Sequence, residues 1–180
     1  GLDKPILDSL GIDKNKPEKQ QRNQTGSPIL EEGDILLNTT LAETNDWQQV
    51  DLPVVRTLRH FCIETLSSYT EDNQACISEV DLLDDKGQPI DKTKWEVVYI
   101  SSEQADKNLG VAENLFDGDI SSFWHTDPAT EPGQPHRIIV DIKEIYKISA
   151  LRFKVRKGAF LSGKVKEINV YGRPQFFLFH

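Results

Sequence analysis

The chain has 180 residues, of which 37% are hydrophobic and 28% are charged, so it can bury one substantial core but is short for two full-sized domains. A formal net charge of -8 makes nucleic acids and anionic membrane surfaces poor partners, because much of the surface repels polyanions. No apolar run approaches the roughly 18 residues that a membrane-spanning helix needs, so we expect no membrane insertion.

The first thirty residues are predicted to form a tail or linker. They contain no aromatic residue and are rich in Lys, Gln, Asn and Pro, a composition that cannot bury enough apolar surface to fold alone. A short docking helix over residues 7–12 is the alternative. The chain starts with Gly and contains no Met, which is typical of a processed product, so the missing export signal does not argue for the cytoplasm.

From Gly33 onward, short β-branched and aromatic segments alternate with Gly, Pro, Asn and Asp, which predicts an antiparallel sandwich or barrel. No helical apolar period persists for three turns, so we expect an all-β domain. Phosphate-binding Gly loops, nucleophile elbows and HExxH are absent, and the residue inventory therefore favours no enzyme. The expected strands are 34–41, 47–52, 54–64, 76–83, 95–101, 137–142, 148–156 and 164–171.

Two cysteines, Cys62 and Cys76, are compatible with a disulfide or with buried thiols. Zinc is disfavoured, because there is no CxxC and the four histidines show no paired ligand spacing.

The segment AENLFDGDISSFWHT carries the most information. Asp117, Asp119 and Ser122 place three oxygen-bearing side chains around Gly118, as a hard cation such as calcium requires of a tight loop. The alternative is an ordinary Asp-Gly-Asp turn that binds nothing.

With the later PHRIIVDI and ISALRFKVR, this segment resembles the discoidin family, also called coagulation factor V/VIII C-type domains. The similarity is greatest to the family 32 carbohydrate-binding modules, which include the sugar-binding domains attached to galactose oxidase and bacterial sialidases. The resemblance implies an antiparallel jelly-roll β-sandwich. It also implies circular permutation, because RTLRHF and ISEVDL resemble strands that normally end the family's chain. Strands 34–41 and 164–171 should then be neighbours, with Asp34 close to Tyr171.

The resemblance also implies a structural calcium ion that pins the Asp-Gly-Asp loop to a strand distant in sequence. The family's ligands map onto Asn114, Asp117, Asp119, Ser122, Ser78 and Glu79.

In the sugar-binding relatives, planar polar groups fix the hydroxyls of a galactose-like sugar and an aromatic ring stacks on its apolar face. The implied ligand-binding residues are His125, Arg156, Ser162, Tyr69, Phe160 and Asn108.

This sequence departs from the family's pattern at several of these positions. Ser162 stands where Asn is expected, Pro128 and Gln74 replace tryptophans, and Asn108 replaces an acidic residue used by some members. Tyr69 and Phe160 are candidate platforms, with a loop aromatic and a plug over the sandwich end as their alternatives. Likewise, His125 has a structural alternative in the Trp124 turn, and Arg156 has one as an ion-pair partner.

We therefore expect a tail over 1–30, a discoidin-like domain over 31–172 and a C-terminal extension over 173–180. The expected function is that of a non-catalytic carbohydrate-binding module that binds a glycan. Its location would be secreted, periplasmic or at the cell surface. A discoidin-like domain that binds a protein partner without sugar is the alternative, motivated by Ser162 and Pro128.

Overall fold

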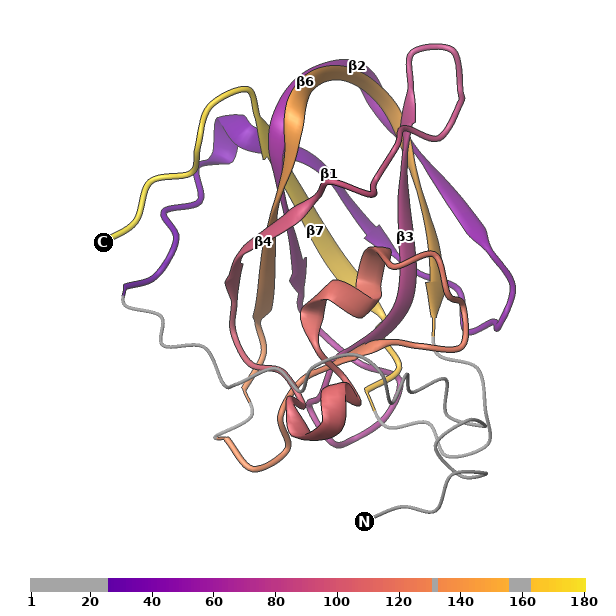
Figure 1. Ribbon diagram of the computed structural model, residues 1–180, viewed down its shortest axis with the longest axis vertical. Helices are drawn as coiled ribbons and strands as arrows, with labels where there is room; N and C mark the ends of the chain where they lie inside the picture. The colour runs from indigo at the N-terminus through magenta and orange to yellow at the C-terminus, as the bar shows by residue number, and fades with distance from the viewer. Residues whose placement is uncertain (1–25, 131–132, 156–162) are drawn as a thin grey trace.

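A computed structural model describes residues 26–130, 133–155 and 163–180 (Figure 1). The described chain is almost entirely antiparallel β-structure, which confirms the predicted all-β class. None of its helices is long and apolar enough to cross a membrane. The strands are β1 (Ile35–Thr40), β2 (Gln48–Thr65), β3 (Cys76–Asp84), β4 (Glu96–Ile100), β5 (Trp124–His125), β6 (His136–Val155) and β7 (Glu167–Arg173). Three 3-10 turns complete the described elements: η1 (Glu32–Asp34), η2 (Asp106–Asn108) and η3 (Ala112–Phe116).

Two long strands, β2 and β6, run through both layers of the sandwich and arch together at the top of Figure 1. The second half of β2 pairs with β7 and with the first half of β6, whereas its first half pairs with the second half of β6. The remaining strands extend each layer, giving the order β1-β7-β2-β6-β3-β5 with β4 on β6. The predicted pairs 47–52 with 54–64, and 137–142 with 148–156, are thus each one bent strand.

The bends have local causes. The β2–β6 register shifts between Asp51 and Arg56, a stretch that contains Pro53, which has no N–H to donate to a ladder. In β6, Lys143 has a φ of 74°, a left-handed conformation that turns the strand out of its pleat. The strands bend at these points and do not end there.

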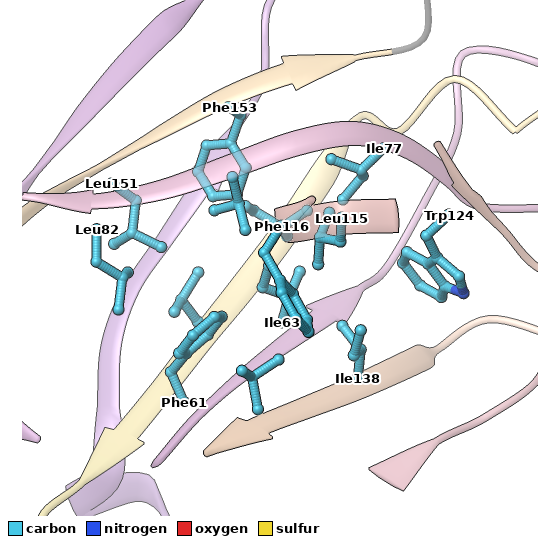
Figure 2. Close-up of a cluster of buried hydrophobic side chains, with 14 of the residues drawn as sticks. Phe61, Ile63, Ile77, Leu82, Leu115, Phe116, Trp124, Ile138, Leu151 and Phe153 are labelled. Atoms are coloured by element: carbon cyan, nitrogen blue, oxygen red, sulfur yellow. The ribbon is translucent and has the colours of Figure 1, made fainter. Parts of the chain in front are cut away.

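The core lies between the two layers and is closed from the side by η3 (Figure 2). Phe61 of one layer faces Leu82 and Leu151 of the other, and Trp95 meets the ring of Phe61 edge-on at 5.5 Å. The labelled core side chains are Phe61, Ile63, Ile77, Leu82, Leu115, Phe116, Trp124, Ile138, Leu151 and Phe153.

The strand pairing required by a circularly permuted order is present. β1 pairs antiparallel with β7, with Ile35 opposite Tyr171 and Thr40 opposite Glu167. Asp34 lies 3.7 Å from the Arg173 guanidinium. The predicted neighbourhood of Asp34 and Tyr171 is therefore confirmed.

The residues after β7 pack against the sandwich. Phe177 is buried in a cluster with Cys62 and Ile139, and the Ile29 N–H donates to the Leu178 carbonyl (2.7 Å). Cys62 and Cys76 are both buried and form no disulfide. Residues 1–25 of the predicted tail lie outside the described residues.

Candidate functional site

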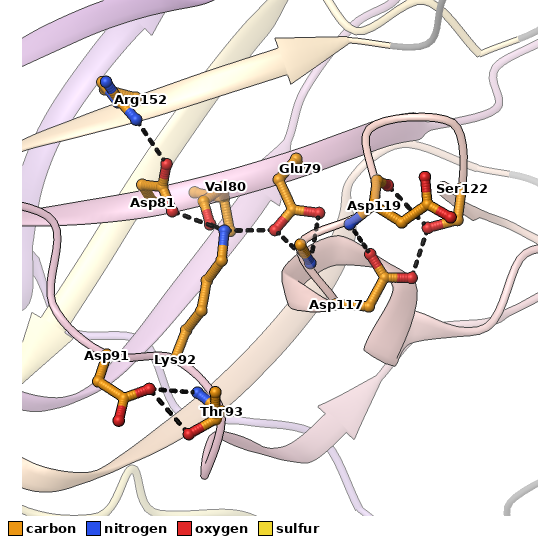
Figure 3. Close-up of polar contacts among 11 residues, drawn as sticks. Glu79, Val80, Asp81, Asp91, Lys92, Thr93, Asp117, Asp119, Ser122 and Arg152 are labelled. Atoms are coloured by element: carbon orange, nitrogen blue, oxygen red, sulfur yellow. Dashed lines mark hydrogen bonds and ion pairs between the residues drawn. The ribbon is translucent and has the colours of Figure 1, made fainter.

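The Asp-Gly-Asp loop follows η3 directly and is closed by its own side chains (Figure 3). Gly118 has a φ of 80°, which a residue with a Cβ rarely adopts. Asp117 accepts hydrogen bonds from the Asp119 N–H (2.9 Å) and the Ser122 hydroxyl (2.5 Å). The Ser122 hydroxyl also lies 3.0 Å from the Asp119 carbonyl oxygen. Three of the predicted cation ligands, Asp117, Asp119 and Ser122, are thus joined to one another by hydrogen bonds.

The loop meets the middle of β3, as the family resemblance implies. The Gly118 N–H lies 3.2 and 3.1 Å from the two carboxylate oxygens of Glu79, which is 1% exposed. Ser78 is buried beside Glu79 in β3, and the Asn114 amide donates to the Phe123 carbonyl (3.0 Å). Glu79 therefore joins Asp117 at one place in the fold, although the two lie far apart in sequence.

An ammonium group that sequence analysis missed lies on the other side of Glu79. Lys92 Nζ contacts the Glu79 carboxylate, donates to Asp81 (2.6 Å) and reaches the Val80 carbonyl (3.2 Å). Asp81 also accepts from Arg152 (2.9 Å). Within the described ranges, no group of three or more His, Cys, Asp and Glu side chains is placed to hold a metal ion.

The turn after β3 could have revealed Lys92. It returns the chain antiparallel to β3, with the Ile90 N–H bonded to the Leu82 carbonyl (3.0 Å). Lys92 lies two residues after Ile90, and Val80 lies two residues before Leu82. The antiparallel register therefore places Lys92 opposite Val80, between the side chains of Glu79 and Asp81.

The electrostatic balance differs between the two carboxylates that share Lys92. Burial raises the pKa of Glu79 to about 8, and the charge of Asp117 adds to this, whereas Lys92 and the Gly118 N–H oppose it. Burial also acts to raise the pKa of Asp81, but Lys92 and Arg152 outweigh it and hold that pKa below its usual value. Glu79 is thus the carboxylate whose charge is least compensated, and a cation beside it would favour its ionised form. The carboxylate, hydroxyl and carbonyl oxygens of these residues are of the kind that calcium takes as ligands.

His125 lies on β5 with its backbone held on both sides. The Gln104 N–H donates to the His125 carbonyl (2.9 Å), and the His125 N–H donates to the Gly110 carbonyl (3.1 Å). A Cβ on Gly110 would lie 2.9 Å from the His125 Cβ, so this approach requires glycine. The His125 side chain is 2% exposed, and its Nδ1 donates to the Thr126 carbonyl (2.5 Å).

Two further predicted sugar-binding residues are described. Asn108 ends η2, two residues before Gly110, so it lies in the loop that clamps His125. The Tyr69 hydroxyl donates to the Leu41 carbonyl (2.7 Å), and Lys166 Nζ lies 5.5 Å from its ring centre. The other three predictions, Arg156, Phe160 and Ser162, lie outside the described residues.

A buried polar network beside His125 was also missed. Thr126 donates to the Gln74 side chain (2.6 Å) and accepts from the Ala75 N–H (3.0 Å), while Ser68 donates to the Gln74 carbonyl (2.5 Å). Through its hydrogen bond to Thr126, Gln74 ties the loop to the end of β5. Because Gln74 is 4% exposed, it offers little surface to a ligand. The sequence marked this position only as a missing tryptophan.

Comparison with known proteins agrees with this geometry. Residues 98–175 match the F5/8 type C domain family. The matched stretch is less than half of the chain. It runs from β4 to just beyond β7, and β1, β2 and β3, which complete the sandwich, precede it. The resemblance to the discoidin family is thereby confirmed.

A sialidase of Micromonospora viridifaciens is 32% identical to this chain over 84 residues. The aligned stretch covers 46% of this chain and 13% of the sialidase. This chain therefore resembles a small part of that protein.

Proposed function

We propose that this chain is a non-catalytic carbohydrate-binding module that recognises a terminal, galactose-like sugar and carries a structural calcium ion. The F5/8 type C match and the likeness to part of a sialidase support the carbohydrate-binding class. We place the sugar site at the end of the sandwich that carries His125. The observation that supports this placement is that the loop containing Asn108 meets His125 there. The same likeness supports an exported protein, in a secreted, periplasmic or cell-surface location.

The adjacent carboxylates Asp84 and Asp85 have a structural role in a turn. Asp84 and Asp85 are adjacent, but Asp84 accepts the N–H groups of Lys86 (2.9 Å) and Gln88 (3.0 Å) within the turn after β3. This arrangement stabilises a turn and presents no paired acid and base to a substrate.

Glycan binding is tested by titration with galactose, fucose and N-acetylated sugars, starting from the unaltered chain. Arg156→Ala and His125→Ala should each abolish binding, because both remove planar polar groups that fix hydroxyl geometry. Because His125 is buried, circular dichroism and the melting temperature of its variant are compared with those of the unaltered chain. Lys86→Ala, at an exposed position in the turn after β3, is the matched control and should bind normally.

The alternative function is recognition of a protein partner without sugar. It is favoured by the burial of His125 and by the Lys166 ammonium over the Tyr69 ring, which leave these groups less open to a sugar. Absence of glycan binding at millimolar sugar, in a chain that remains folded, would favour this alternative over the first proposal.

Calcium binding is tested through thermal stability. A ligand that binds only the native state at a hundred times its Kd stabilises by about 2.7 kcal/mol, which corresponds to a rise in Tm of about 5–10 °C. Asp117→Asn should remove this rise. Asp127→Asn should retain it, because Asp127 caps a comparable turn through the Ala129 N–H (2.9 Å).

Lys92→Met should enlarge the calcium-dependent rise, because it removes the ammonium that contacts Glu79. An equal Tm in calcium and in chelator for the unaltered chain would contradict calcium binding.

A further inference from the structure

A hollow of about 670 Å³ lies at the other end of the molecule from His125. His125 pairs with Cys76 at the start of β3, whereas Asp84 at the end of β3 pairs with Ile148, next to the bend of β6. β3 spans 9 residues, or about 26 Å from first to last at roughly 3.3 Å per residue. The hollow is formed at that bend and by the segment that leads into β4.

The hollow has an apolar base and a polar rim, the arrangement common to small-molecule sites. Trp95 and Ile142 are buried at the base, and Tyr146 is half-buried beside them. The Trp95 indole N–H is buried and has no hydrogen-bond partner among the described residues, so this donor is left unsatisfied within the chain. The rim residues are Asp91, Thr93, Lys94, Glu96, Lys143 and Glu144.

Most of the rim groups are held in position by contacts within the chain. Lys143, at its left-handed backbone position, pairs with Glu96 (2.7 Å). The Tyr146 hydroxyl donates to Glu144 (2.8 Å). Asp91 accepts the N–H (2.9 Å) and the hydroxyl (2.8 Å) of Thr93, contacts that Figure 3 also draws. The rim is therefore organised before any ligand arrives.

The charges of the rim restrict the ligand. Three carboxylates face two ammonium groups, and one ammonium, on Lys143, is already paired with Glu96. The remaining charged groups are the carboxylates of Asp91 and Glu144 and the ammonium of Lys94. Negative charge is therefore in excess at the rim, which repels an anion. A ligand must present hydroxyl groups to these donors and acceptors and an apolar face to Tyr146.

We propose that this hollow is a second saccharide-binding site, which takes a neutral or amine-bearing sugar and excludes acidic sugars. The apolar base and hydroxyl-binding rim match the two faces of a pyranose ring. The proposal stands independently of a site at His125, because none of the hollow's lining residues belongs to that loop cluster. With both sites occupied, one molecule would hold two glycan chains at opposite ends of the sandwich.

The test follows the three indole N–H signals of the full-length chain by ¹H–¹⁵N NMR during titration with glucose, glucosamine and glucuronic acid. Trp95 reports on the hollow, and Trp124, whose indole donates to the Ser102 carbonyl (3.1 Å), reports on the His125 end. We expect glucose or glucosamine to shift the Trp95 signal and glucuronic acid to leave it unchanged. A Trp95 signal that no sugar moves, or that glucuronic acid moves as far as glucosamine, would overturn the proposal.

Variants separate this site from the first. Tyr146→Ala should weaken the Trp95 response about tenfold, the equivalent of about 1.4 kcal/mol of lost ring contact. If Tyr146→Ala does not fold, the variants Asp91→Ala and Glu144→Ala, at exposed positions, are used in its place. Each should weaken the Trp95 response at least tenfold. Lys147→Ala, exposed on the same bend but not lining the hollow, is the control. His125→Ala should leave the Trp95 response intact, so failure of the site at His125 and failure of this site give different results.

Discussion

Asp141, just before the bend of β6, receives hydrogen bonds from two residues and lies close to a third. Arg59 donates to both carboxylate oxygens (3.0 and 3.2 Å), the Lys143 N–H donates at 2.8 Å, and His60 Nε2 lies 3.6 Å away. Burial acts to raise the pKa of Asp141, but these donors and the positive charges outweigh it and hold that pKa below its usual value. The ionised carboxylate thus ties β2 to the bend of β6.

Asp141→Asn should lower the free energy of unfolding by about 2 kcal/mol at pH 7, the typical contribution of hydrogen bonds to a charged group. Because the folded-state pKa lies below the unfolded value of about 3.9, this stabilisation is present above that value and is lost as the pH falls through the folded pKa. Urea unfolding at pH 7, 5 and 3 should show the two proteins converging at low pH. Asp51→Asn, at an exposed position, should show a smaller difference, and a gap for Asp141→Asn that does not change with pH would contradict the argument.

At the scale of residues, sequence reasoning located the loop chemistry and missed the groups that neutralise it. Asp117 and Glu79 were placed together through the family resemblance, and the structure brings them into contact through Gly118. Lys92 and Gln74 carry no motif, because their roles depend on strand register and on burial. A lone Lys in a polar segment cannot be told from a solvated one until its neighbours across the turn are known.

At the scale of elements, the expected strands are present, but their ends were less predictable than their existence. The breaks expected between 52 and 54 and between 142 and 148 are bends in the continuous strands β2 and β6. Pro and charged residues mark both a bend and a loop, so sequence alone gives the same signal for either. The hollow at the β6 bend could not be predicted for this reason.

The segment after β7 works as a cover over the outer side of β2. Phe177 is 3% exposed and packs on Cys62, whereas Phe176 is 58% exposed, with its ring 4.3 Å from that of His60. Burial raises the pKa of the Cys62 thiol, which keeps it protonated and unreactive.

Phe177→Ala should lower the free energy of unfolding by about 3–4 kcal/mol through the lost contacts and the cavity left behind. It should also make Cys62 accessible to a thiol reagent under native conditions. Phe176→Ala is the matched control and should change both quantities much less. Cys76, buried in β3, is the internal reference. Modification of Cys62 at the same rate in both variants would show that Phe177 is not the cover.

At the scale of the molecule, the order of strands in space was predictable because the family resemblance supplied it. Composition and periodicity reached only an antiparallel sandwich or barrel, since a period-two pattern says which residues face inward but not which strands pair. The pairing of β1 with β7 came from recognising the rearranged order, and the observed register agrees with it.

This pairing also orders events during synthesis. β7 is the hydrogen-bonded neighbour of β1 in the described sheet, and Thr40 meets a partner that lies more than a hundred positions later. On a ribosome, which releases the chain from its N-terminal side, β1 leaves the exit tunnel long before β7. During that interval the backbone of Ile35–Thr40 is an open strand edge, able to pair with another chain. Its polar outer residues, Asn38 and Thr40, then help to keep the nascent protein from aggregating before its own last strand arrives.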